Sequence, residues 1–415
     1  MTVPEARELE AAAAANLALP SGPPLLVPLE VVAPAPVRER LSRLGRTEDI
    51  RLSPSRRRLA IACYAIDRIA VADVELSATE VRLTRLELLA SPAVRQPHGL
   101  DFVDDDTLVV ASREGGLAVL PIPAGDVPPT AWDVTPTAVH AASGHDDSPG
   151  SVAVATADGG GHELLVCVNW THTLKRHRLH AGTLSPPDVA ARRWLDVPDG
   201  VAISPDGRWV AVSNHFSHSV FVYERHSLGE GAEPVAILRG ATYPHGLRFS
   251  ADARRLVVAD AGAPHVHVFA AAEGGWSGAS YPAATVAVLD DATYRRGRHT
   301  PQEGGPKGLE LDARTNVMLV TCEETPFLCF DVGAVVDDPG SVAPDADALV
   351  RYELHAIAAV DDATPLARIA REQAGASEHA ALLEAELAAI KATRAWRLLE
   401  PARAAYGGVR RRVRR

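Results

Sequence analysis

The chain has 415 residues, of which 47% are hydrophobic and only 5% aromatic. A hydrophobic share of this size is enough for a large core, which must be packed mainly by Val, Leu, Ile and Ala. The formal net charge of −11 argues against nucleic acid as a partner, because nucleic acid attracts basic surfaces. The four cysteines have no CxxC spacing, so we expect reduced, buried thiols at Cys63, Cys167, Cys322 and Cys329.

The N-terminal region, residues 1–45, is predicted to be an appendage. Residues 4–17 are rich in alanine and predict a helix, and residues 20–36 form a proline-rich connector that contains the apolar segment LLVPLEVV. That segment is a candidate for an extra closing strand. Acidic residues stand where a secretory signal would be basic, and no apolar run reaches the length of a membrane span. We therefore expect a cytoplasmic protein.

A phrase of short strands separated by turns recurs six times along the chain. The copies begin at Thr47, Pro97, Pro149, Pro198, Pro244 and Pro306, a spacing of roughly fifty residues that is typical of propeller repeats. Four antiparallel strands at this period predict a radial arrangement, because one small sheet cannot bury both of its faces. The sequence thus predicts an all-β fold, a six-bladed β-propeller over residues 46–360.

Two connections within the repeats stand out. The glycine-rich turn at Asp158–Gly161 is predicted to end a hairpin and not to hold a phosphate, because no helix follows it. The junction at Asp290–Gly305 is longer and more charged than the others. It is either a lid over one face or a surface loop.

The repeats should bring polar residues together at the channel mouth. Antiparallel strands return the chain to the same end at every second strand, so the start of each copy and the loop after its second strand share one face. The first set is Glu48, His98, Gly150, Asp199, His245 and Lys307. The loop set is Tyr64, Arg113 with Glu114, Asn169 with Trp170, Asn214 with His215, Asp260, and Glu323.

The first set carries different ionisable groups at five of its six positions, whereas a structural repeat position usually keeps one residue type. Two imidazoles and two carboxylates are suitable ligands for a divalent cation, which makes metal ligands of Glu48, His98, Asp199 and His245. Asp199 and His245 are the catalytic candidates, one of them as a general base. Candidate ligand-binding residues are Lys307, Trp170, Asn214, His215, Arg113 and Tyr64. Two alternatives remain open: direct binding of a polar ligand such as a sugar, or charged groups that only satisfy one another and water.

With these residues the chain resembles six-bladed propellers of the gluconolactonase and strictosidine-synthase-like group, and more loosely the YVTN and NHL repeat proteins. The resemblance covers about residues 47–356. In the lactonases a divalent metal is held by a Glu of the first blade, an Asn in an N-G-L phrase and an Asp in a P-D-G phrase. Glu48 and Asp199 match the first and the last, but Gly150 stands in the Asn position. The resemblance implies a small polar, sugar-like or lactone ligand and metal-assisted hydrolysis, with a non-catalytic interaction scaffold as the alternative.

The C-terminal region, residues 361–415, is predicted to be a helical tail that ends in an arginine cluster. Residues 363–399 are rich in Ala, Glu, Leu and Arg, and from Ala363 onward there are 11 basic and 5 acidic residues. Such a tail suits an anionic membrane surface or a protein partner, or it is a solvated end. The segment KATRAWRLLEPARA resembles the tails of bacterial cell-surface polysaccharide enzymes, notably glycosyltransferases, which implies an association with polysaccharide assembly.

Overall fold

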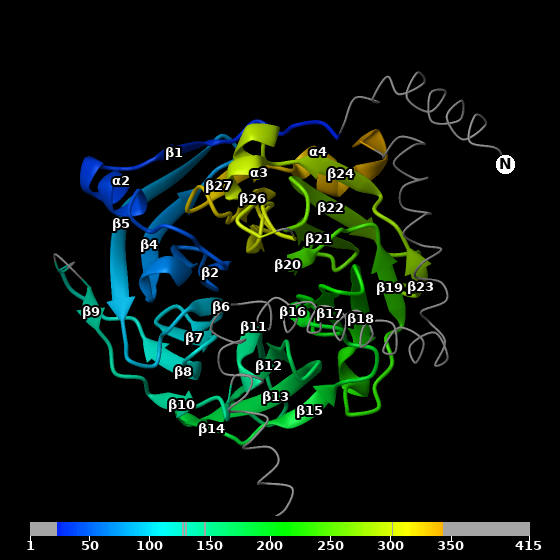
Figure 1. Cartoon of the computed structure of the whole chain (residues 1–415), viewed down its shortest axis with the longest axis horizontal. Helices are drawn as coiled ribbons and strands as arrows, with labels where there is room; N and C mark the ends of the chain where they lie inside the picture. The colour runs from blue at the N-terminus through cyan, green and yellow to red at the C-terminus, as the bar shows by residue number, and fades with distance from the viewer. Residues whose placement is uncertain (1–22, 127, 129–130, 145–146, 301, 343–415) are drawn as a thin grey trace, which may run out of the picture. The chain divides into compact units, whose positions relative to one another are not determined.

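The computed structural model describes residues 23–126, 128, 131–144, 147–300 and 302–342. The chain divides into two units, Met1–Glu353 and Leu354–Arg415, and all described residues belong to the first. They form six β-sheets around a central channel (Figure 1), which confirms the predicted six-bladed propeller. The helices predicted at 4–17 and in the tail lie outside the described residues.

The innermost strand of each blade lines the channel. In chain order these strands are β2 (Ile50–Leu52), β6 (Pro97–Asp104), β11 (Pro149–Thr156), β16 (Pro198–Ile203), β20 (Pro244–Phe249) and β25 (Leu309–Leu311). A glycine near the start of the strand lets neighbouring blades approach closely. A Cβ atom on Gly200 would lie 2.1 Å from the carbonyl oxygen of His245, and one on Gly246 would lie 2.5 Å from that of Lys307. Only glycine fits there.

Further strands follow outward, mostly in antiparallel order. The second strands are β3 (Arg58–Cys63), β7 (Thr107–Ser112), β12 (His162–Val168), β17 (Trp209–Asn214), β21 (Arg255–Asp260) and β26 (Val317–Val320). The third strands are β4 (Arg68–Leu76), β8 (Gly116–Pro121), β13 (Thr173–His180), β18 (Ser219–Glu224), β22 (His265–Ala270) and β27 (Leu328–Asp331). The outer strands are β5 (Glu80–Ala90), β10 (Ala138–His140), β14 (Thr183–Leu184), β15 (Asp188–Ala191), β19 (Ala236–Arg239) and β24 (Ala284–Ala287), and β9 (Trp132–Asp133) and β23 (Gly278–Ser280) add parallel edges.

Six hydrophobic clusters lie between the neighbouring blades. They consist mainly of Val, Leu, Ile and Ala, as the low aromatic content requires. The cluster between blade 1 and blade 6 contains Ile61 and Leu319, so the ring of blades is closed by side-chain packing. The four cysteines are buried and unpaired, as predicted.

A strap formed by residues 24–32 runs along the outer edges of blades 5, 6 and 1. The Leu26 amide donates to the Ala287 oxygen at 2.8 Å, and the Leu29 amide donates to the Cys329 oxygen at 2.8 Å. Strand β1 (Glu30–Val32) then pairs in parallel with β5. The predicted closing segment therefore does add a strand, and it adds it to blade 1. Blade 6 has three strands among the described residues, and the fourth strand predicted for it, at 349–356, lies outside them.

The turns and helices complete the described chain. The turn at residues 158–161 joins β11 to β12 with positive φ angles at its three glycines, which confirms the predicted hairpin end. The junction at 290–305 contains α3 (Asp291–Gly297), where the Asp290 side chain accepts from the Thr293 amide. The remaining helical elements are α2 (Ala35–Leu41), α4 (Gly333–Asp337), η1 (Tyr64–Ile66), η3 (Arg225–Ser227) and η4 (Pro339–Val342).

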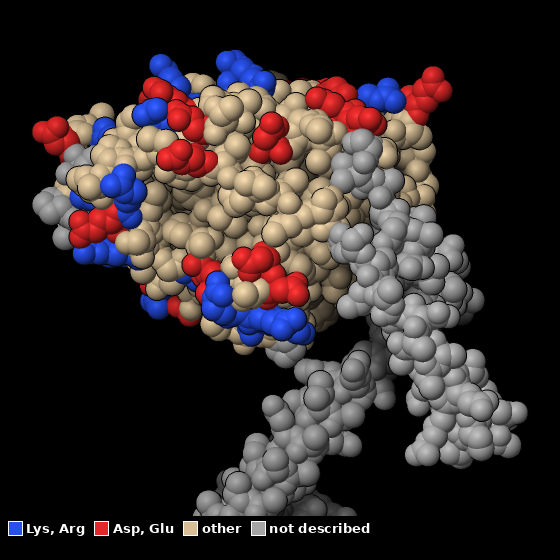
Figure 2. Space-filling model, turned by 90° about the horizontal axis from the view of Figure 1, so that it is seen from above, with Lys and Arg blue, Asp and Glu red and all other residues tan. Residues whose placement is uncertain are grey.

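The described surface carries charges of both signs. Figure 2 shows Lys and Arg next to Asp and Glu in small mixed groups over the side of the propeller in view. Within residues 23–342, apart from the gaps, no helix combines the length and the apolar composition that a membrane span needs.

Candidate functional site

The polar residues at the start of the innermost strands face one another in the channel. Glu48 and Lys307 precede their strands but continue the pairing, since their amides donate to the oxygens of Ala62 and Thr321. We call this set the upper ring, and it consists of Glu48, His98, Asp199, His245 and Lys307. None of these side chains is more than 7% exposed. The structure thus brings together the five ionisable residues that the repeat register placed there.

Asp199 lies at the centre of one half of the ring. Its Oδ1 accepts hydrogen bonds from Asn169 Nδ2 at 2.8 Å and from Arg113 Nη2 at 3.0 Å. Its Oδ2 lies 3.1 Å from His245 Nε2 and 3.5 Å from His215 Nε2, yet no described residue makes a hydrogen bond to it. Burial favours the neutral acid, but the neighbouring imidazoles, His245 first, outweigh burial and hold the pKa of Asp199 well below its usual range. Asp199 is therefore ionised.

Glu48 lies at the centre of the other half. Its Oε1 accepts from Arg46 Nε and, at 3.0 Å, from Lys307 Nζ. Its Oε2 has no hydrogen-bond donor among the described residues and lies 3.7 Å from the Nε2 atoms of both His98 and His245. Burial would raise the pKa of Glu48, but Lys307 and the other positive neighbours lower it below the ordinary value. The ring thus contains two ionised carboxylates, each with one unpartnered oxygen.

Lys307 is a fully buried cation surrounded by carboxylates. Its Nζ lies 2.7 Å from Glu323, 2.9 Å from Glu303 and 3.0 Å from Glu48. Burial lowers the pKa of this amine, but Glu48 and Glu303 raise the pKa by more than burial lowers it, so it lies above the usual value. Glu303 belongs to the junction at 290–305, so the junction reaches the ring, and Tyr294 Oη anchors it to blade 5 by donating to the Gly262 oxygen at 2.6 Å.

Two histidines of the ring have lowered pKa values. Burial, reinforced by Arg113, lowers the pKa of His98 to about 3, and burial also lowers the pKa of His245. Arg113 Nη2 lies 2.9 Å from His98 Nε2, and a guanidinium can only donate, so this nitrogen accepts and Nδ1 carries the proton. The ring centroids of His98 and His245 lie 5.4 Å apart, and that of His215 lies 4.0 Å from that of Tyr243.

The loop residues that reach the ring directly follow the second strands. This position is held by Tyr64, Arg113, Asn169, His215 and Ala261, and Glu323 lies three residues after the end of β26. Asn214 and Asp260, which we expected at the mouth, lie one position earlier and turn back to the backbone. Asn214 Oδ1 accepts from the Asp196 amide at 3.1 Å, and Asp260 accepts from the Thr242 and Tyr243 amides at 2.7 Å. The expectation was wrong by one residue because it did not account for where the second strand ends.

The other expected ligand-binding residues lie at the rim. Trp170 is 47% exposed, and Tyr64 donates to Gln96 Oε1 at 3.0 Å while the Arg46 guanidinium lies 4.5 Å from its ring centroid. Arg46 and Glu303 were missed by the sequence reasoning. The only sequence signal for Arg46 is that it stands two residues before Glu48, and Glu303 had no signal beyond the unusual charge of its junction.

Asn169 occupies the space at the sixth ring position. A Cβ atom on Gly150 would lie 2.6 Å from Asn169 Oδ1 and 3.1 Å from Asp199 Oδ1. The glycine at the position where the lactonases have Asn therefore makes room for an Asn that comes from the next loop. This amide binds Asp199 and Arg113.

A lower tier of charged residues lies three positions further along the same strands. Irregular register near the strand starts puts both tiers on the channel side. The lower tier consists of Arg51, Asp101, Arg248 and Glu310, with Asp49 beside Arg51 at 3.1 Å. Its carboxylates accept backbone amides: Val154 and Phe102 donate to Asp101, Leu52 and Leu311 to Glu310, and Ile50 and Leu100 to Asp49.

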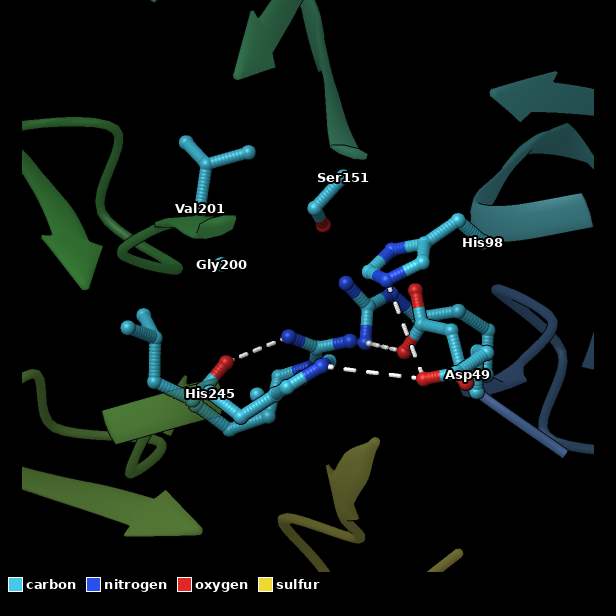
Figure 3. A pocket seen from close by; sticks show the side chains of 11 residues that line it. Asp49, His98, Ser151, Gly200, Val201 and His245 are labelled. Atoms are coloured by element: carbon cyan, nitrogen blue, oxygen red, sulfur yellow. Dashed lines mark hydrogen bonds and ion pairs between the residues drawn. The ribbon is translucent and has the colours of Figure 1, made fainter. Parts of the chain in front are cut away.

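A small cavity separates the tiers. Figure 3 shows His98 and His245 pointing toward its centre from different strands, with Ser151, Gly200 and Val201 on the far wall. Its volume of about 10 Å³ is close to the minimum for one water molecule. The cavity therefore suits a water molecule or a single ion, and a larger ligand would have to enter from the mouth.

Two sets of three buried side chains could hold a metal ion. Glu48, His98 and His245 form one set, and Asp199, His215 and His245 form the other, each with ligand atoms within 4.8 Å of one another. Each set contains side-chain atoms without a hydrogen-bond partner among the described residues: Glu48 Oε2 and His98 Nδ1 in one set, and Asp199 Oδ2 and His215 Nε2 in the other. Carboxylate oxygens and neutral imidazole nitrogens are suitable ligands for divalent cations.

Comparisons with known proteins do not show a family. No family model matches the sequence, and no curated protein matches it. Similar solved structures include the putative 6-phosphogluconolactonase of Bacteroides uniformis, with 12% identity and a TM-score of 0.42 over 66% of this chain and 77% of that one. A putative gluconolactonase has 16% identity and a TM-score of 0.43 over 69% and 88%, and a luciferin-regenerating enzyme has 11% and 0.46 over 68% and 86%.

These structures include the lactonase-like propellers that the sequence resembles. Likenesses of this size establish neither a family nor an activity, so the functional argument rests on the chemistry of the ring.

Proposed function

We propose that the upper ring binds a divalent cation and uses it to hydrolyse a small polar ester or lactone. The observation that supports this proposal is the pair of buried, ionised carboxylate oxygens, Glu48 Oε2 and Asp199 Oδ2, to which no described residue makes a hydrogen bond. A buried anionic oxygen without a donor is costly. A cation that binds either oxygen offsets this cost.

The donor set fits such a cation. Two carboxylates and three imidazoles converge from four blades, and the lowered pKa values of His98 and His245 favour the neutral imidazole that a metal ligand requires. Asn169 and Arg113 hold Asp199 by its other oxygen, Oδ1. Partners of this kind fix the orientation of a ligating group and preserve the site before the cation arrives.

A divalent cation held by these residues would polarise the substrate carbonyl and lower the pKa of its bound water. Both ligand sets include His245 and leave one buried carboxylate outside: Glu48 if Asp199 binds the cation, and Asp199 in the opposite case. That remaining carboxylate would orient the attacking water by accepting a hydrogen bond from it. Arg46 and Arg113, at 31% and 20% side-chain exposure, flank the entrance and contact the polar part of the ligand. The choice of a lactone is supported by the sequence resemblance.

The test combines metal analysis with an activity screen. We expect the purified full-length protein to carry about one divalent ion per chain and to hydrolyse aldonolactones, and Asp199→Asn should lose both properties. The matched control is Asp101→Asn, a buried channel carboxylate of the lower tier, which should keep the ion. Retention of the ion by Asp199→Asn would contradict the proposed site.

A second candidate is a cation-binding scaffold without catalysis. The observation that favours it is burial, since no upper-ring side chain is more than 7% exposed. A stoichiometric ion in a protein that hydrolyses none of the screened esters would support this alternative.

Attachment of the arginine-rich tail to an anionic surface or a protein partner remains a prediction. It is tested by comparing the binding of the full-length protein with that of protein truncated after residue 362.

A further inference from the structure

The two sets of ligand atoms overlap, so they are alternatives. Both include His245, whose Nε2 lies 3.7 Å from Glu48 Oε2 and 3.1 Å from Asp199 Oδ2, and an imidazole nitrogen has a single lone pair for one cation. One set is completed by Glu48 and His98, the other by Asp199 and His215. Which set binds the cation therefore depends on which of these other atoms are available.

Arg113 engages one set and leaves the other open. Its Nη2 lies 2.9 Å from His98 Nε2 and 3.0 Å from Asp199 Oδ1. Because a guanidinium has no acceptor, it occupies the lone pair with which His98 would bind a metal. Arg113 donates to Asp199 Oδ1, whereas His245 lies next to Oδ2. Asp199 Oδ2 and His215 Nε2 therefore stay without hydrogen-bond partners among the described residues.

The position of Arg113 is well defined. Its Nη1 donates to Asn169 Oδ1, and its backbone amide donates to the Gln96 oxygen at 3.0 Å. The side chain is nevertheless 20% exposed, whereas that of Lys307 is fully buried. Replacement of Arg113 should therefore disturb the packing less than replacement of Lys307.

Resting on the proposed cation site, we propose that Arg113 directs the divalent cation to Asp199, His215 and His245 by keeping His98 engaged. Glu48 then stays outside the coordination sphere. Its unpartnered Oε2, 3.7 Å from His245 Nε2, would then accept a hydrogen bond from the attacking water. Arg113 is a positioning residue in this scheme, because it acts on the cation through His98.

The test measures how much each histidine contributes to Zn²⁺ affinity with and without Arg113. His98→Ala and His215→Ala are made in the wild type and in Arg113→Met, and Zn²⁺ is titrated by calorimetry into the full-length protein. With Arg113 present, His215→Ala should weaken Kd about tenfold or more, and His98→Ala less than about threefold. In Arg113→Met, His98→Ala should weaken Kd about tenfold or more. Arg113→Gln serves as a second background if Arg113→Met does not fold.

Arg46→Met is the matched control, because it removes a guanidinium that contacts Glu48 and not His98. In this background the dependence on His98 should stay small. If the wild type binds Zn²⁺ and His98→Ala weakens Kd equally with and without Arg113, only the role of Arg113 is overturned. Absence of Zn²⁺ binding in both the wild type and Arg113→Met overturns the proposed function as well.

Discussion

The two tiers of the channel use similar residues in opposite ways. In the lower tier, each carboxylate accepts two backbone amides and lies near an arginine, as Asp101 lies 3.8 Å from Arg51. In the upper ring, Glu48 and Asp199 each keep one oxygen without a donor. Backbone donors are fixed by the fold, whereas a buried carboxylate oxygen without a donor needs a partner from outside the fold, such as a cation. The difference separates a structural tier from a candidate site.

The largest effect should come from the arginine of the lower tier. Arg51→Met leaves Asp49 buried without its cation, so we expect the free energy of unfolding to fall by about 3–5 kcal/mol. Urea unfolding measures this change, and calorimetry should find the Zn²⁺ affinity nearly unchanged. Arg58→Met, at an exposed pair with Asp106, is the control and should cost at most about 1 kcal/mol. A parallel loss of Zn²⁺ affinity in Arg51→Met would show that the tiers are not separate.

The tiers should also respond to pH with opposite signs. Burial raises the pKa of Glu310 to about 7 and that of Asp101 to about 6, so the folded state binds more protons than the unfolded state. Their stabilising contribution is complete below the unfolded pKa values and is lost as pH rises through the folded ones. Glu48 and Asp199 have lowered pKa values, so their contribution is present at neutral pH and is lost only in acid.

Glu310→Gln isolates the contribution of the lower tier. Between about pH 5 and about pH 8 the free energy of unfolding should fall less in this variant than in the wild type, by on the order of 1–3 kcal/mol. Urea unfolding at both pH values gives the difference. Equal pH dependence in the two proteins would mean that Glu310 does not take up a proton on folding.

The smallest effect should come from filling the sixth ring position. In Gly150→Ala the new methyl group displaces the Asn169 amide, which then no longer holds Asp199. We expect Zn²⁺ affinity to fall about tenfold, as for other residues that orient a metal ligand, and stability to change by about 1 kcal/mol. Gly229→Ala is the control, since a Cβ atom there meets nothing within 4 Å. Unchanged affinity in Gly150→Ala would remove Asn169 from the site.

The sequence predicted the upper ring because its information is periodic. A proline, a variable residue and a glycine before an apolar strand place His98, Asp199 and His245 at one level of the channel, and the structure has them there. The loop residues were predicted less well, because the end of a strand decides whether His215 or Asn214 points inward. The contacts of Glu303 have no repeat signal, since they depend on how the junction at 290–305 folds back onto the channel mouth. Arg46 lies before the first strand of blade 1, outside the repeat positions.

The strap implies an order of events during folding. Leu26 pairs with Ala287, and Leu29 pairs with Cys329, so the strap is synthesised before blade 1 but finds these partners only when blades 5 and 6 have been synthesised. Contacts between such distant parts of a chain form slowly, because a long loop must close before they contribute. Until then the edge strands of blades 5 and 6 have unpaired backbone groups, which are open to pairing with other chains. The strap, which supplies little of the core, therefore protects the nearly complete propeller from aggregation at the last step of its assembly.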